Sequence, residues 1–117
     1  MDRLKVGIVG TGWVSGEYIK AFGQNPHAKI PAICGTSHEK VRAKVEEYGL
    51  SHIQSFDDYD TFLAESGVDI VTIVTPNYLH AEQTIKAANA KKHIVIEKPL
   101  ATDWSDMKKM QEAVHAN

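Results

Sequence analysis

The sequence predicts an α/β fold in which helices cover both faces of a doubly wound parallel sheet. Strand-like and helix-like segments alternate along all 117 residues. The strand-like segments, such as D-I-V-T-I-V-T at 69–75, are rich in β-branched residues, as in strands buried on both faces. A glycine turn joins the first strand to the first helix. Because helical connections between parallel strands are right-handed, we expect five strands in the order 3-2-1-4-5.

Short apolar runs mark the strands, and breaks at glycine, proline and asparagine separate them. We place the five strands at 4–9, 29–35, 53–56, 69–75 and 93–96. Pro31 lies near the start of the second strand and predicts imperfect pairing there, because proline has no N–H to donate to the ladder.

Apolar residues at helical spacing define the helices between these strands. The first helix ends near 25–26, the second at a Gly49 C-cap, and the third covers 59–65 and ends at Gly67. The last begins after a cap at Thr102-Asp103. The expected inward residues are Ser15, Tyr18, Ile19 and Phe22, then Val41, Val45 and Tyr48, then Ala81, Ile85 and Ala88, and finally Met107, Met110 and Val114.

Composition bounds the function. The formal charge of −2 gives no basic excess, so nucleic acid is not expected as a partner, and no apolar run is long enough to span a membrane. Cys34 is the only cysteine and cannot form an internal disulfide; we expect a buried strand residue in a cytoplasmic protein. The histidines show no metal-ligand spacing, and no metal site is predicted.

The glycine turn at 10–15 has the pattern G-x-G-x-x-S and predicts a nucleotide site. Gly10 permits a tight turn, Gly12 lets the backbone approach a pyrophosphate, and the helix N-terminus attracts its negative charge. Ser15 takes the third small position and Gly16 follows it. The turn residues expected to bind cofactor are Gly10, Thr11, Gly12, Trp13 and Val14. Trp13 either covers the pyrophosphate or packs on the first helix.

The predicted strand order brings three loops together. Chain direction across the sheet reverses between the first and fourth strands, and a crevice opens there at the carboxyl ends of the strands. The loops at 10–15, 75–78 and 97–99 should converge at this crevice. The sequence therefore predicts a Rossmann-type dinucleotide-binding domain.

The position that reads the adenosine ribose carries no carboxylate. An acid is expected about 20 residues after the glycines, but Gly35 stands there. Thr36 and Ser37 offer hydroxyl groups, and Lys40 offers a positive charge to a 2′-phosphate. These residues favour NADP(H) over NAD(H). In the alternative, Thr36 and Ser37 cap the next helix and Lys40 is merely solvated.

Two further motifs follow the fourth and fifth strands: T-P-N-Y-L-H at 75–80 and E-K-P at 97–99. Together with the glycine turn, in this order and over essentially the whole chain, they resemble the glucose–fructose oxidoreductase and inositol dehydrogenase family (Gfo/Idh/MocA). The resemblance implies that Lys98 contacts both the substrate and the nicotinamide ribose, beside Glu97, and that the Lys98–Pro99 bond is cis. It also implies a cleft-lining role for Thr75, Pro76, Asn77 and His80.

Lys98 is the expected catalytic residue. Removal of a hydride from a carbinol carbon accompanies loss of the hydroxyl proton, and a nearby ammonium would stabilise the developing alkoxide. For His80, a general-base role and a local hydrogen-bonding role both remain open.

The sequence thus predicts the NAD(P)-binding domain of a dehydrogenase or reductase acting on a sugar, polyol or related carbonyl. The alternative is a non-catalytic redox-sensing or regulatory module; a methyltransferase has no support at 97–98. The resemblance further implies a sixth strand and a substrate domain beyond Asn117. We therefore expect a fragment that is inactive alone and comes from a homo-oligomeric protein.

Overall fold

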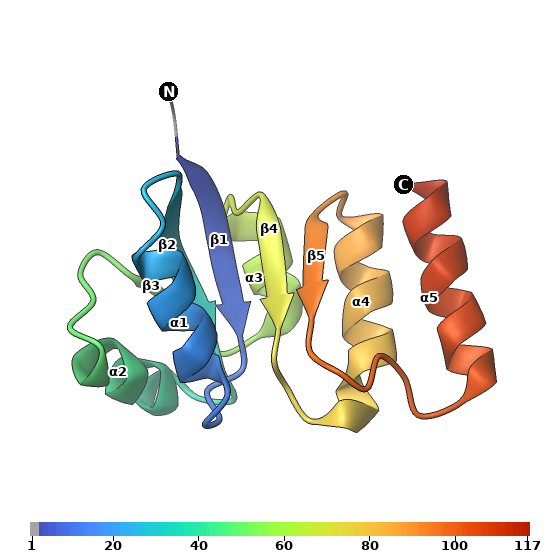
Figure 1. Ribbon diagram of the computed structural model, residues 1–117, viewed down its shortest axis with the longest axis horizontal. Helices are drawn as coiled ribbons and strands as arrows, with labels where there is room; N and C mark the ends of the chain where they lie inside the picture. The colour runs from blue at the N-terminus through green and yellow to red at the C-terminus, as the bar shows by residue number, and fades with distance from the viewer. Residues whose placement is uncertain (1–2) are drawn as a thin grey trace.

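A computed structural model describes residues 3–117. It shows a five-stranded parallel sheet in the order β3-β2-β1-β4-β5, as predicted (Figure 1). In chain order the elements are β1 (Leu4–Val9), α1 (Ser15–Gly23), β2 (Ala28–Cys34), α2 (His38–Glu47), β3 (Gln54–Phe56), α3 (Tyr59–Glu65), β4 (Ile70–Ile73), the 3₁₀ turn η1 (Asn77–Leu79), α4 (His80–Asn89), β5 (His93–Ile96) and α5 (Trp104–Ala116).

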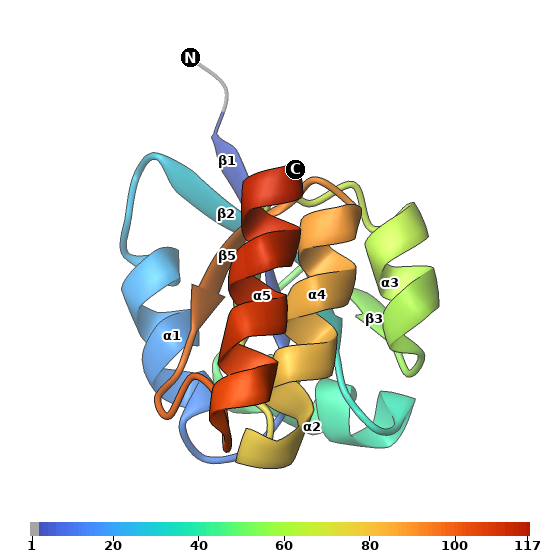
Figure 2. The same ribbon diagram turned by 90° about the vertical axis from the view of Figure 1, so that its right-hand side faces the viewer.

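Each face of the sheet has its own apolar core. On one face, side chains of α1 and α2 such as Ile19 and Val41 pack on Ile8. On the other, Phe62 and Leu63 of α3 and residues of α4 pack on the opposite side of the same strands. Figure 2 shows α1 on one side of the sheet and α3 with α4 on the other. This alternation along buried strands produces the two-faced, doubly wound arrangement.

Local sequence explains several details of the sheet. The β1–β2 register shifts between the pairs Lys5–Lys29 and Gly7–Ala32, so two β2 residues, one of them Pro31, lie opposite Val6. The irregular pairing predicted at Pro31 is confirmed. Some predicted strand ends differ by one or two residues: β2 begins at Ala28, β3 at Gln54, and β4 covers only Ile70–Ile73.

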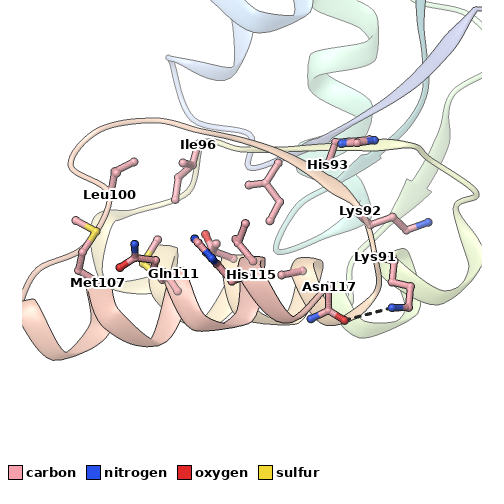
Figure 3. A pocket seen from close by; sticks show the side chains of 14 residues that line it. Lys91, Lys92, His93, Ile96, Leu100, Met107, Gln111, His115 and Asn117 are labelled. Carbon is pink, nitrogen blue, oxygen red and sulfur yellow. Dashed lines mark hydrogen bonds between the residues drawn. The ribbon is translucent and has the colours of Figure 1, made fainter.

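The inward face of α5 is only partly as predicted. Met110 is buried and Met107 is half-buried, but Val114 is 50% exposed, so its expected inward position is wrong. Its side of α5 faces an apolar groove of about 700 Å³ beside the edge strand β5 (Figure 3). Val114 is exposed because helix α5 packs mainly on α4 and does not cover this groove.

Candidate cofactor site

The glycine turn has the backbone that its sequence predicts. Gly10 has φ +119°, and a Cβ there would lie 2.8 Å from the carbonyl oxygen of Val74. Only glycine fits both the conformation and the space. A Cβ at Gly12 would meet nothing within 4 Å, so open space lies over this part of the turn. Ser15 is buried and its hydroxyl donates to the Gly12 carbonyl at 2.6 Å, which fixes the turn from below.

Gly16 has a separate packing role. A Cβ at this position would overlap the hydroxyl of Tyr48, at the end of α2. The absence of a side chain therefore lets α1 and α2 approach closely. Two small residues are therefore needed at the start of α1: Ser15 fixes the glycine turn, and Gly16 leaves room for Tyr48.

A cleft of about 850 Å³ lies at the carboxyl edge of the sheet. Of the residues predicted for the site, those that line it are Gly10, Thr11, Gly12, Trp13, Val14, Thr36, Lys40, Thr75 and Pro76. Those that do not line it are Ser37, Asn77, His80, Glu97 and Lys98. Trp13 is 81% exposed at the cleft, so it does not pack on the first helix. The volume and the open backbone at Gly12 fit an elongated dinucleotide.

The cleft also contains residues that the sequence reasoning missed. They come from the ends of β2 and β3, from α2, α3 and α4 and from the turn η1, and they include Cys34, Lys44, Asp57, Tyr59, Tyr78, Leu79 and Gln83. Thr75 donates its hydroxyl proton to Gln83 Oε1 at 2.5 Å, which leaves the amide NH₂ of Gln83 as a donor at the cleft. The available signal was topological, because Asp57 directly follows β3 at the same edge of the sheet.

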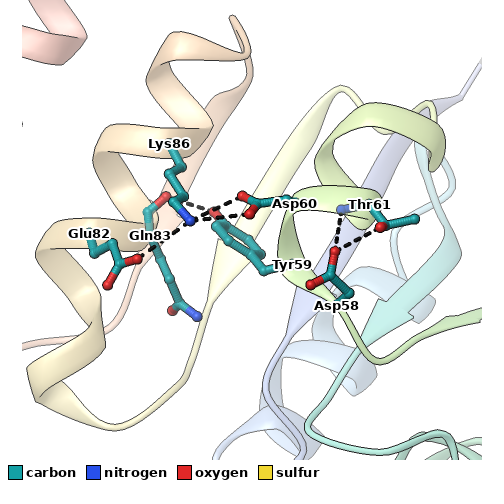
Figure 4. Close-up of polar contacts among 7 residues, drawn as sticks. All are labelled: Asp58, Tyr59, Asp60, Thr61, Glu82, Gln83 and Lys86. Carbon is teal, nitrogen blue, oxygen red and sulfur yellow. Dashed lines mark hydrogen bonds and ion pairs between the residues drawn. The ribbon is translucent and has the colours of Figure 1, made fainter.

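Polar contacts between α3 and α4 hold one wall of this cleft (Figure 4). The Tyr59 hydroxyl donates to the backbone carbonyl of Gln83 at 2.6 Å. Lys86 Nζ lies 3.1 Å from Asp60 and 3.4 Å from Glu82, and its hydrogen bond to Asp60 is the main cause of a raised Lys86 pKa. These contacts keep Tyr59 and Gln83 on the same wall.

The corner of the cleft around Gly35, at the end of β2, has no room for an acid at position 35. A Cβ at Gly35 would lie 2.9 Å from Thr11 Cγ2 and 3.1 Å from Val41 Cγ2. Ser37 caps α2 by accepting from the Lys40 N–H at 3.2 Å, as the capping alternative for this residue expects.

The same corner carries charges of both signs. Lys40 and Lys44 line it from α2, and Lys44 is 3.5 Å from Glu47. Asp57 lines it from the loop just after β3 and lies 3.5 Å from His38 Nε2. Lys40 and Lys44, the latter paired with Glu47, therefore share the corner with the carboxylate of Asp57.

The loop after β5 is held at Glu97. One carboxylate oxygen of Glu97 accepts from the Tyr18 hydroxyl at 2.6 Å and the other from the Lys98 N–H at 3.2 Å. The Tyr18 hydrogen bond is the main cause of a lowered pKa of Glu97, and the same bond raises the pKa of Tyr18. The Lys98–Pro99 bond is cis, as the resemblance implied. The Lys98 side chain takes part in none of the ion pairs formed within residues 3–117.

His80 lies between the loop after β4 and the loop after β5, and it does not line the cleft. Its side chain is 1% exposed, with Nδ1 2.7 Å from the Pro99 carbonyl oxygen and Nε2 2.9 Å from that of Thr75. A neutral imidazole donates to one such oxygen and an imidazolium to both. In either form the ring connects the loop after β4 to the loop after β5.

Cys34 forms part of the cleft wall as a buried thiol. Burial is the main reason that its pKa rises to about 12, and it is a buried strand residue as predicted. Within the described part of the chain, no three His, Cys, Asp or Glu side chains are grouped so as to hold a metal ion. No helix in residues 3–117 has the length and apolarity needed to cross a membrane.

Comparisons with known proteins agree with this geometry. Residues 4–117 match the family model of the Gfo/Idh/MocA oxidoreductases, described as an NAD-binding Rossmann fold. Levoglucosan dehydrogenase of Pseudarthrobacter phenanthrenivorans is 33% identical over 97% of this chain and 31% of its own length.

Two solved structures share the fold closely. The WlbA dehydrogenase of Bordetella pertussis, in complex with NADH and UDP-GlcNAcA, has a TM-score of 0.90 at 33% identity, over 99% of this chain and 34% of that one. Biliverdin reductase of Synechocystis, with biliverdin and NADP⁺, has a TM-score of 0.86 at 26% identity, over 97% of this chain and 35% of that one. The chain thus spans about a third of the length of these proteins. It belongs to the Gfo/Idh/MocA oxidoreductase family, and residues 4–117 form the NAD-binding Rossmann domain of that family.

Proposed function

We propose that this chain is the cofactor-binding part of a longer NAD(P)-dependent dehydrogenase or reductase acting on a sugar, polyol or related carbonyl. A bound nicotinamide would supply the hydride acceptor or donor. The glycine turn, with Gly10 and Gly12, would hold the pyrophosphate, and the cleft beside Thr36 and Gln83 would hold the adenosine half. Relatives that act on levoglucosan or bind a nucleotide sugar support the substrate class.

Lys98 carries the catalytic part of this proposal. Its ammonium is exposed at the end of β5, outside the ion pairs of the described chain, on a loop fixed at Glu97 and Pro99. A lysine so placed can hold a proton at the oxygen of a substrate hydroxyl and stabilise that oxygen as its negative charge develops. A sensing module has no need for such a group.

The test compares Lys98→Met with wild type in the full-length protein, using a panel of sugars and polyols to find turnover. We expect turnover to fall by about 100-fold or more, while cofactor affinity falls by less than about fivefold. Two outcomes would favour the redox-sensing alternative. In one, the protein binds cofactor and Lys98→Met leaves turnover unchanged; in the other, the protein binds cofactor but turns over no substrate of the panel.

We further propose a preference for NADP(H). The absence of a carboxylate at Gly35, together with Lys40 and Lys44 at the same corner, favours a 2′-phosphate; Asp57 opposes it. Relatives with NADH and with NADP⁺ both occur, so these local charges carry the proposal. Lys40→Glu should reduce the preference for NADPH over NADH. An unchanged ratio of the two affinities would refute the role of Lys40 in that preference.

We also propose a cytoplasmic location and a homo-oligomeric full-length protein. Cys34 supports the first, since it is the only cysteine of these 117 residues and forms no disulfide within them. Family resemblance supports the second. Fractionation of cells and light scattering of the purified full-length protein test them.

A further inference from the structure

We propose that Tyr18 is a positioning residue: its hydroxyl, on α1, holds Glu97 and thereby keeps Lys98 in place at the nicotinamide end of the site. This inference rests on the proposed function. It assigns a role to a residue that sequence periodicity placed only in the apolar stripe of α1.

The contact joins distant parts of the chain. Tyr18 and Glu97 are 79 residues apart, and their side chains meet at 2.6 Å. The Tyr18 ring is half-buried against the core on the α1 face, so packing fixes the direction of its hydroxyl. Glu97 uses its second oxygen to accept from the Lys98 N–H. The carboxylate is therefore bonded at both oxygens and links α1 directly to the backbone of Lys98.

The strand order places this link on the nicotinamide side. In a doubly wound sheet the pyrophosphate lies at the glycine turn and the adenosine ribose lies over the end of β2. The other half of a dinucleotide must then extend over β4 and β5, on the opposite side of β1. Lys98 follows β5 on that side. Helix α1 thus carries the pyrophosphate turn at its start and the tether of the Lys98 loop one turn later.

A second contact supports the same loop from α4. The Pro99 carbonyl oxygen lies 2.7 Å from His80 Nδ1, so Lys98 is flanked by one tether on each side. The Lys98 ammonium itself makes none of the ion pairs within the described residues. Its position is therefore set by its flanking residues, and Tyr18 controls one of the two tethers.

The pKa shifts of the two groups favour the protonation states that this tether needs. The hydrogen bond raises the pKa of Tyr18 and lowers that of Glu97, so phenol and carboxylate keep the donor and acceptor forms that the bond needs. The positive charges that face Glu97 are Lys98, from its own loop, and His80 when protonated, from α4.

The test uses Tyr18→Phe in the full-length protein, with Tyr48→Phe as the matched control. Tyr48 also packs beside α1, but its hydroxyl makes none of the side-chain hydrogen bonds found within residues 3–117. Calorimetry measures the binding of NADPH and NADH. It also measures the binding of two ligands that lack nicotinamide, ADP-ribose and its 2′-phosphate. Tyr18→Phe should weaken dinucleotide binding about threefold and leave ADP-ribose binding unchanged.

A double-mutant cycle separates positioning from general damage. If Tyr18 acts through Lys98, Tyr18→Phe should cause no further loss in a Lys98→Met background. The positioning role is overturned if Tyr18→Phe changes dinucleotide affinity no more than Tyr48→Phe does, or if it weakens ADP-ribose binding by the same factor as dinucleotide binding. It is also overturned if the affinity losses of Tyr18→Phe and Lys98→Met multiply in the double variant. Wild-type protein that binds neither dinucleotide would instead refute the proposed function, and the positioning role with it.

Discussion

Replacing His80 by alanine should destabilise the protein substantially. The ring is fully buried, with each nitrogen beside a backbone carbonyl oxygen. Removing it leaves at least one partly buried carbonyl oxygen without its donor, at a cost of about 1–2 kcal/mol, and the cavity left by the buried ring adds about 1–2 kcal/mol. We expect a loss of about 3 kcal/mol in the free energy of unfolding, or roughly 12 °C in Tm for a domain of this size.

Thermal unfolding followed by circular dichroism measures this change, with His115→Ala as the control. His115 is exposed near the end of α5, and its replacement should change stability by less than about 0.5 kcal/mol. Hydrogen exchange should show the loss of protection concentrated at 75–80 and 97–99. A His80→Ala variant as stable as His115→Ala would refute the connecting role assigned to this ring.

Three further predictions follow from single features. Gly10→Ala should abolish detectable cofactor binding, because its Cβ would meet the Val74 carbonyl oxygen; calorimetry with retained affinity would refute this. Cys34 should resist a thiol reagent in the folded protein and react after denaturation, because burial raises its pKa to about 12; rapid labelling of the native state would contradict it. Glu97 has a lowered pKa, so its contribution to stability should be present above its unfolded pKa and be lost as pH falls through the folded one. Tyr18→Phe should reduce that acid-side dependence, and identical pH–Tm curves would exclude it.

Local patterns were sufficient to predict the order of elements. The spans Leu4–Val9, Tyr59–Glu65 and His93–Ile96 agree with the structure at both ends, because a continuous apolar run or a capped helix marks each of them. The fourth strand was predicted too long. Val74 is buried and its N–H still bonds to Val9, so composition alone does not show that the ladder ends before it.

The site was harder to predict where contacts are distant in sequence. The glycine turn and Lys40 could be placed from spacing, since the turn directly follows β1 and Lys40 lies in the first turn of the helix that follows β2. The Tyr18–Glu97 bond could not, because a tyrosine in an apolar stripe gives no sign of a partner 79 residues away. Gln83 was missed for the same reason, because three-dimensional proximity and not local sequence brings it to the cleft. Asp57 directly follows β3, so its position at the sheet edge could have been found from the strand order.

Calorimetric titration of the full-length protein with NADPH, and separately with NADH, is the decisive test of whether the cleft at the glycine turn binds a nicotinamide dinucleotide. We expect the full-length protein to bind both dinucleotides, with higher affinity for NADPH, and the Gly10→Ala variant to bind neither. Higher affinity for NADH would keep the site and refute the cofactor preference. Failure of the full-length protein to bind either dinucleotide would refute the cofactor site at the glycine turn and the oxidoreductase function proposed from it.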